Sequence, residues 1–223
     1  MKNPRRIEDD VYIIGGRGLS HVDDCSVYLI NTGGLVLIDS GVGAGVDQLV
    51  SNIKKIGLSP ENLEAILVSH AHIDHIGGLK QFKDEFGIKV IAHNLDVSRI
   101  ENGVGIGAEL YDITYTPCSV DIKIMQEEET LEFGDKRLNI IHIPGHTPGS
   151  IAAYLDTANG RILFGQDIHG PYTPELGSNI EDARKSLQKL IDLKADILCE
   201  GHFGVYRPAE TVEKYIKGYL HSL

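Results

Sequence analysis

Short apolar runs alternate with stretches of helical periodicity in the first half of the chain. The runs are rich in Val, Ile and Leu and are bounded by Gly, Asn and Asp, which is typical of strands. Between them, apolar residues recur three and four positions apart, which predicts helices that begin near Val46 and Leu79 and stop at Gly57 and Gly87. The predicted strands span residues 11–16, 25–31, 35–39, 65–68 and 89–92.

The second half contains two predicted hairpins and two predicted helices. A capping box of Ser178 and Glu181 predicts that one helix begins at Ser178, and Pro208 is a favourable first residue for the last helix. The segment 94–126 has the weakest pattern, and its glycine string at 103–107 predicts a loop. The predicted hairpins pair 129–133 with 136–143 and 151–155 with 161–164, and a further strand spans 196–199.

The composition is that of an acidic globular protein. Of 223 residues, 42% are hydrophobic and 24% are charged, and 32 acidic against 21 basic side chains give a formal net charge of −11. From this length we expect residues 1–223 to form a single domain built from two similar halves. Because phosphate backbones and anionic headgroups repel such a chain, neither a nucleic acid nor a membrane is an expected partner.

Neither a secretion signal nor a membrane-spanning segment is predicted. The N-terminal residues are polar and then acidic, with no apolar stretch behind the basic ones. No apolar run approaches the roughly 18 residues that a bilayer requires. Cys25, Cys118 and Cys199 lie far apart, which argues against a disulfide framework and fits a reducing compartment. We therefore expect a cytoplasmic protein.

The densest chemical signal is the sequence Ser-His-Ala-His-Ile-Asp-His at 69–75. His70 and His72 follow a predicted strand at positions i and i+2, so in extended backbone their imidazoles share a face and can chelate one ion. Asp74 and His75 come where the chain turns toward a helix, so they can face a second ion. Neutral imidazole and carboxylate donors suit zinc, iron or manganese.

Three more candidate ligands each follow a predicted strand and lie beside glycine. His146 follows the strand that ends at 143, Asp167 the strand that ends at 164, and His202 the strand that ends at 199. Four strand ends that deliver His and Asp side chains are the arrangement expected of a metal site at the edge of a layered α/β fold.

Five motifs occur in order along the chain: LVLIDSG at 35–41, SHAHIDHIGG at 69–78, PGHTPGS at 144–150, GQD at 165–167 and GH at 201–202. Together they resemble the metallo-β-lactamase superfamily, and in particular its glyoxalase II-like and lactonase-like hydrolases. The resemblance covers nearly the whole chain. It implies an α/β fold, a four-layer αββα sandwich in which two mixed sheets pack together with helices outside and the metals lie in a cleft between the halves.

The resemblance also implies a role for each residue of the cluster. Two divalent ions are expected, zinc first, with iron or manganese as alternatives. Asp39, at the end of a predicted strand, would orient a ligand imidazole. The first ion would be held by His70, His72 and His146, the second by Asp74, His75 and His202, and Asp167 would bridge them.

The implied activity is that of a binuclear hydrolase acting on a small molecule. A metal-bridging hydroxide would attack the carbonyl of an ester, thioester, lactone or amide. Asp74 would accept the proton of the attacking water, and His169 or Tyr172 would protonate the leaving group. Because the sequence ends soon after His202, we expect no counterpart of the C-terminal domain with which glyoxalase II grips glutathione.

Two rival functions remain within the same superfamily. A mononuclear iron enzyme like the persulfide dioxygenases retains much of the same ligand set, and metal content would distinguish it from a binuclear hydrolase. A phosphodiesterase or nuclease is disfavoured by the charge of −11. We expect the loops at 94–126 and 169–177 to set substrate specificity. The oligomeric state stays open, with a homodimer as one alternative.

Overall fold

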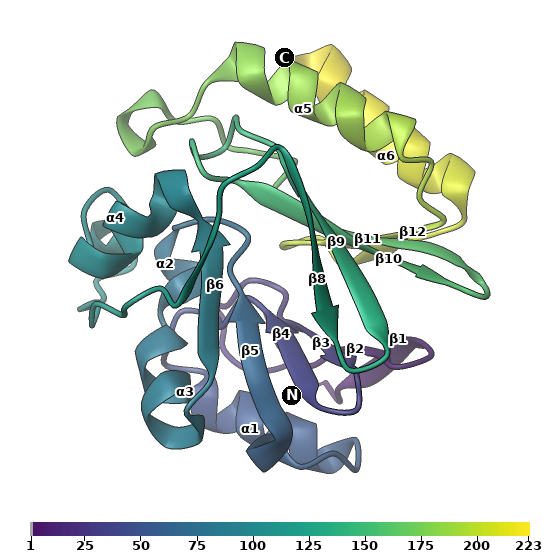
Figure 1. The fold of residues 1–223 in the computed structure, drawn as a ribbon. Coiled ribbons are helices and arrows are strands. Elements are labelled where there is room, and N and C mark those ends of the chain that lie inside the picture. Colours follow the sequence, from purple (N-terminus) through teal and green to yellow (C-terminus); the bar gives the residue numbers. More distant parts are fainter. Residues whose placement is uncertain (1) are drawn as a thin grey trace.

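Two β-sheets pack face to face in the computed structural model, which describes residues 2–223 (Figure 1). The first sheet contains, in spatial order, β1 (Arg5–Glu8), β2 (Val11–Ile13), β3 (Tyr28–Asn31), β4 (Leu35–Ile38), β5 (Leu63–Leu67), β6 (Lys89–His93) and β7 (Ile122–Ile124). The second contains β13 (Val205–Tyr206), β12 (Ile197–Glu200), β11 (Gly160–Gln166), β10 (Ile151–Thr157), β9 (Lys136–His142) and β8 (Glu128–Phe133).

Helices cover the outer face of each sheet, which confirms the expected αββα sandwich. Both sheets are mixed, because β4 to β7 run parallel beside the antiparallel β1 to β4, and β11 and β12 are parallel within an otherwise antiparallel sheet. The first sheet carries α1 (Val46–Lys55), α2 (Ile73–Ile76), α3 (Leu79–Phe86) and α4 (Asn94–Asn102), and the second carries α5 (Ile180–Asp192) and α6 (Ala209–Ser222) (Figure 1).

Three apolar clusters fill the three spaces between the four layers. Along β4, Leu37 packs in the cluster under the first set of helices, whereas Val36 and Ile38 pack in the cluster between the sheets. Along β11, Phe164 packs between the sheets and Leu163 packs under α5 and α6. Because side chains alternate along a strand, a strand that is buried on both faces is apolar at successive positions. This is why these strands appear in the sequence as unbroken apolar runs.

Contacts between the sheets tie the first sheet to the loop after β12. The Tyr28 hydroxyl donates a hydrogen bond to the Glu200 carbonyl oxygen at 2.6 Å, and the Ser26 amide donates to the Gly201 carbonyl oxygen at 2.6 Å. The Tyr28 ring also meets the Phe164 ring edge-on, with centroids 5.8 Å apart. These contacts hold β3 close to the ends of β11 and β12.

Two predicted helix starts are corrected by the structure. Asn179 caps α5, since its side chain accepts a hydrogen bond from the Asp182 amide at 3.2 Å. The predicted capping box at Ser178 is wrong, because the Ser178 hydroxyl instead donates to the His146 carbonyl oxygen at 2.7 Å. Pro208 is the cap residue before α6 rather than its first helical residue.

The weakly patterned segment contains a helix that the sequence pattern did not indicate. Helix α4 occupies its first nine residues, and the glycine string at 103–107 follows as the predicted loop. None of the helices within residues 2–223 combines the length and apolar character needed to cross a membrane. The three cysteines are buried and unpaired, as expected.

Candidate metal centre

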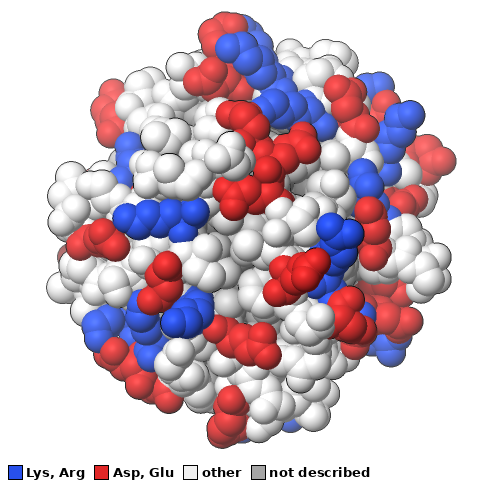
Figure 2. Space-filling model, in the orientation of Figure 1, with Lys and Arg blue, Asp and Glu red and all other residues white. Residues whose placement is uncertain are grey.

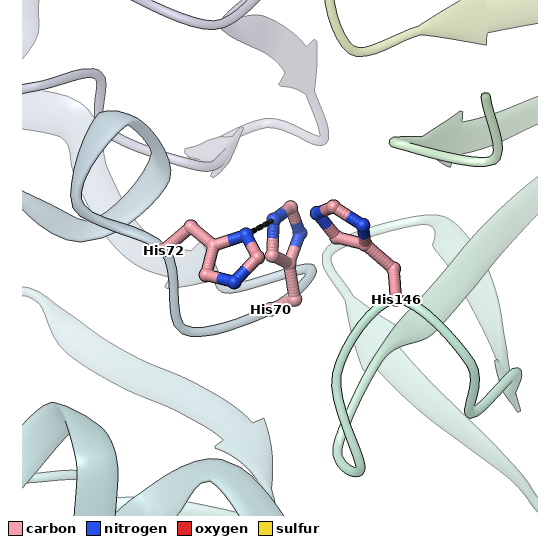
Figure 3. Close-up of side chains that lie close together, drawn as sticks. All are labelled: His70, His72 and His146. Carbon is pink, nitrogen blue, oxygen red and sulfur yellow. Dashed lines mark hydrogen bonds between the residues drawn. The ribbon is translucent and has the colours of Figure 1, made fainter. Parts of the chain in front are cut away.

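Three histidines from two loops converge in one group. His70 and His72 follow β5, and His146 lies in the loop after β9. Figure 3 shows the three imidazoles turned toward one another. His70 Nε2 lies 3.1 Å from His72 Nδ1, and the His146 ring lies 4.6 Å from the His70 ring and 4.5 Å from the His72 ring, centroid to centroid.

A second group of donors adjoins the first and shares a carboxylate with it. Asp74 and His75 lie in α2, and Asp167 and His202 lie just past the ends of β11 and β12. Asp167 Oδ2 lies 3.2 Å from His202 Nε2 and 3.3 Å from His75 Nε2. The same oxygen lies 3.6 Å from His146 Nε2 and 3.8 Å from His70 Nε2. The structure thus brings all seven predicted ligands together, with Asp167 between the two groups.

These spacings fit the requirements of bound metal ions. Zinc lies about 2.05 Å from an imidazole nitrogen, so the donors around a tetrahedral ion are about 3.3 Å apart. Within residues 2–223, His75 Nε2, His146 Nε2 and Asp167 Oδ1 are buried and have no hydrogen-bond partner. Unpartnered buried polar atoms are costly, and a cation between the donors would satisfy them.

Burial sets the protonation of the first group. It lowers the pKa of His72 to about 4 and that of His146 to about 3, and it lowers the pKa of His70 well below the ordinary value. Loss of solvation penalises the charged imidazolium form at each of these positions. The three imidazoles are therefore neutral near pH 7, which is the form that binds metals.

The second group carries opposite charges. Burial raises the pKa of Asp167, but the positive charge of His75 and hydrogen bonds from His202 outweigh this effect and hold it well below the ordinary value. Burial lowers the pKa of His202, but hydrogen bonds to Asp167 and Asp74 prevail and raise it to about 10. The two carboxylates are therefore ionised, and a metal ion that binds between them would displace the protons of His75 and His202.

Hydrogen bonds behind the ligands orient them. His75 Nδ1 donates to Asp39 Oδ2 at 2.7 Å, so its Nε2 faces Asp167. Asp39 also accepts from the Ser69 amide and hydroxyl, both at 2.7 Å, and from the side-chain amide of Gln166. The structure thus places Asp39 against His75, the imidazole that it would orient, and its role stays a prediction. His146 Nδ1 donates to the Pro171 carbonyl oxygen at 3.0 Å, which turns its Nε2 to the centre.

Asp96 clamps the two loops that carry the first three histidines, and the sequence analysis missed it. Its Oδ2 accepts from the Ala71 amide at 2.9 Å and from the Thr147 hydroxyl at 2.6 Å, while Oδ1 accepts from the Gly149 amide at 3.0 Å. The side chain is almost fully buried. A carboxylate in the first turn of a helix is common, so only its burial distinguishes Asp96 from an exposed residue.

Glu200 is a second buried carboxylate that the sequence analysis missed. Its Oε2 accepts from the backbone amides of His202 and Phe203, both at 2.6 Å, and its Oε1 lies 2.5 Å from His169 Nδ1. Glu200 therefore positions the loop that carries His202 and fixes the His169 ring. With Nδ1 bonded to Glu200, His169 presents Nε2 as its remaining polar atom.

A cleft of about 450 Å³ opens onto the two groups of donors. His72, Asp74, His146, Asp167 and His202 line it, and so does His169. Both loops that were expected to set substrate specificity supply lining residues, from 106–111 and from 169–176. Residues 17–26, which were not predicted to take part, also line the cleft. The Tyr172 hydroxyl donates to the Ile168 carbonyl oxygen at 3.0 Å, and Tyr172 does not line this cleft. Of the two residues predicted to protonate a leaving group, His169 therefore lines the cleft and Tyr172 does not.

Gly201 provides a test of how closely the backbone approaches Asp167. A Cβ atom at position 201 would overlap Asp167 Oδ1. We expect Gly201→Ala to displace this carboxylate and to lower zinc affinity by about tenfold or more, since misplacing groups around a metal has effects of this size. Zinc titration of the purified variant measures the change. Gly218→Ala is the control, because its Cβ would meet no atom within 4 Å and it lies in α6.

Known proteins share both the sequence and the fold. A sequence model described as "Metallo-beta-lactamase superfamily" matches residues 22–202. Hydroxyacylglutathione hydrolase GloC of Haemophilus influenzae is 29% identical in an alignment of 190 residues, with 82% of this chain and 86% of that protein covered. Acyl-coenzyme A thioesterase MBLAC2 of Gallus gallus is 27% identical over 215 residues, with 83% of this chain and 74% of that protein covered. The class B3 di-zinc metallo-beta-lactamase LRA-12 from an Alaskan soil metagenome superposes with a TM-score of 0.80 and 25% identity, covering 100% of this chain and 91% of that one.

Proposed function

The chain belongs to the metallo-beta-lactamase superfamily, and we propose that it is a binuclear metal-dependent hydrolase of small esters, thioesters, lactones or amides. The observation that carries the proposal is the position of Asp167, whose Oδ2 lies within 3.8 Å of histidine nitrogens from both groups. A carboxylate so placed is suited to bridge two ions. The di-zinc description of the LRA-12 neighbour supports zinc as the first choice of metal.

The candidate ligands form two sets, and one further ligand, Asp167, belongs to both. Two ions bound here would supply an activated water and would polarise the substrate carbonyl. Asp39 and Pro171 hold His75 and His146 in the tautomers whose Nε2 atoms face the site. One ion would be held by His70, His72 and His146, the other by Asp74, His75 and His202, and both by Asp167.

Two side chains that line the cleft would move protons. Asp74 is a carboxylate at the cleft surface and would accept a proton from the attacking water. His169 would give a proton from Nε2 to the leaving group, while Glu200 holds its Nδ1. Tyr172 is the second choice for that role, because its hydroxyl is already bonded to a backbone oxygen.

The names of two relatives support a thioester as the first substrate to test, and the net charge of the chain favours a small molecule over a nucleic acid. Hydroxyacylglutathiones and acyl-coenzyme A molecules, on which two relatives act by name, are both thioesters. The net charge is −11, and acidic and basic side chains are interspersed on the face shown in Figure 2. An excess of carboxylates raises the energy of a bound polyanion, which favours a small molecule over a nucleic acid.

Metal analysis combined with a substrate panel tests the proposal. We expect two zinc ions per chain, loss of hydrolysis after treatment with a chelator, and recovery when zinc is restored. The panel contains acyl thioesters, lactones and β-lactams, each followed by release of its product. A single ion at saturating metal, or no hydrolysis of any class by the zinc-loaded protein, would contradict the proposal. One iron per chain with oxygen uptake would point to the persulfide dioxygenase alternative.

A further inference from the structure

Exposed apolar side chains gather at the cleft. Eight large apolar side chains within residues 2–223 are exposed, and three of them line this one cleft: Val22 at 56%, Leu110 at 72% and Phe203 at 60% exposure. The other five, which include Val104 at 71%, do not line it. Isolated exposed apolar residues are common, but a group of them around one cavity is typical of a binding surface.

The three side chains come from three separate segments. Val22 lies in the loop before β3, Leu110 ends a short 3-10 helix (Ala108–Leu110), and Phe203 follows β12. The half-buried Tyr111 and Leu176 also line the cleft and extend this apolar surface. We call the set of Val22, Leu110 and Phe203 the apolar wall.

Phe203 is held in its exposed position by the protein. Its amide donates to the buried carboxylate of Glu200 at 2.6 Å, and its ring meets the His169 ring edge-on with centroids 4.7 Å apart. An aromatic ring fixed next to the candidate metal centre loses little conformational entropy when a ligand covers it. It is therefore well suited to contact a substrate.

The cleft offers few partners for a charged acyl group. Apart from the candidate metal ligands and His169, its charged residues are Arg17, Asp23 and Asp24. Asp24 is buried and bonded to the Ser20 hydroxyl and the Val42 amide. Among the described residues, Arg17 is thus the one Lys or Arg whose side chain lines the cleft. The apolar wall, Tyr111 and Leu176 line the cleft beside the donors, and an apolar group is favoured against them.

We propose that the apolar wall binds the acyl chain of the substrate, so that the enzyme prefers medium-chain acyl esters or thioesters to acetyl ones. The inference depends on the proposed hydrolase function and names the substrate class of the same site. Burial of each methylene against the wall favours the longer chain, by up to about fourfold in affinity when burial is complete. The preference for longer substrates should end when the acyl chain is longer than the cleft can bury.

A chain-length series with zinc-loaded protein tests this inference. The substrates are thioesters of one thiol with acetyl, butyryl, hexanoyl and octanoyl groups. We expect kcat/KM to rise by about twofold to fourfold for each added methylene up to hexanoyl. Leu110→Ser and Phe203→Ser should each lower the ratio of the hexanoyl to the acetyl kcat/KM by about tenfold.

Val104→Ser is the matched control, because Val104 is as exposed as Leu110 and does not line the cleft. It should leave the whole series unchanged. Zinc content is measured in each variant, so that an altered metal site is recognised. Equal kcat/KM for acetyl and hexanoyl thioesters would overturn the inference alone, as would equal losses on both substrates in zinc-replete variants. No hydrolysis of any member by the zinc-loaded wild type would overturn the proposed function as well.

Discussion

Replacing Asp167 with alanine is expected to lower kcat/KM by about a thousandfold or more. Its Oδ2 lies within 3.8 Å of four histidine nitrogens that belong to both donor groups. Removing it would take away the shared ligand, and metal ions contribute several kcal/mol of transition-state stabilisation in such sites. Since about 1.4 kcal/mol corresponds to tenfold in rate, a loss of this size follows. Steady-state kinetics on the best thioester measures it.

Comparing Asp167→Ala with His169→Ala distinguishes a residue that would bind the metals from one that would donate a proton. His169 lines the cleft and is bonded to Glu200, but it belongs to neither donor group. We expect its loss to cost about a hundredfold at most, the lower range for a general acid. Both variants are analysed for metal. Comparable losses in kcat/KM, with two ions still bound in each variant, would refute the different roles assigned to these residues.

Asp96→Ala is expected to destabilise the protein by about 3 kcal/mol or more and to weaken zinc binding by about tenfold to a hundredfold. The substitution leaves the Ala71 and Gly149 amides and the Thr147 hydroxyl without their buried acceptor. Each unsatisfied group costs about 1–3 kcal/mol. The loops that carry His70, His72 and His146 would then lose their common anchor. Denaturant unfolding and zinc titration give the two quantities.

Ser98→Ala, on the exposed side of the same helix, is the control for Asp96. We expect it to change the free energy of unfolding by less than about 0.5 kcal/mol. Asp96→Asn keeps the shape of the side chain but replaces one acceptor oxygen with a donor, so we expect an intermediate effect. If Asp96→Ala bound zinc as tightly as the wild type, the two loops would not depend on this carboxylate for their positions.

Local pattern was sufficient for most strands, for most helices and for the set of donors, but it did not predict the edge strands β1, β7 and β13. Strands such as β4 and β11 are apolar at successive positions because both faces are buried, and this is visible without any partner strand. Asp39 and Asp167 directly follow β4 and β11, and His70, His146 and His202 lie two to four residues past the ends of β5, β9 and β12. Side chains at strand ends have few directions available, so the sequence alone indicated that these donors converge. Their roles as metal ligands stay predictions.

Tertiary structure alone decided which residues support and surround those donors. Asp96 lies 51 positions before its partner Thr147, and Glu200 lies 31 positions after His169. Such pairs form only when separate loops fold together, and no local spacing encodes them. For the same reason Ser178 bonds the loop of His146 instead of capping α5. The apolar wall likewise combines residues of three distant segments, and the sequence of each segment alone does not indicate that they meet.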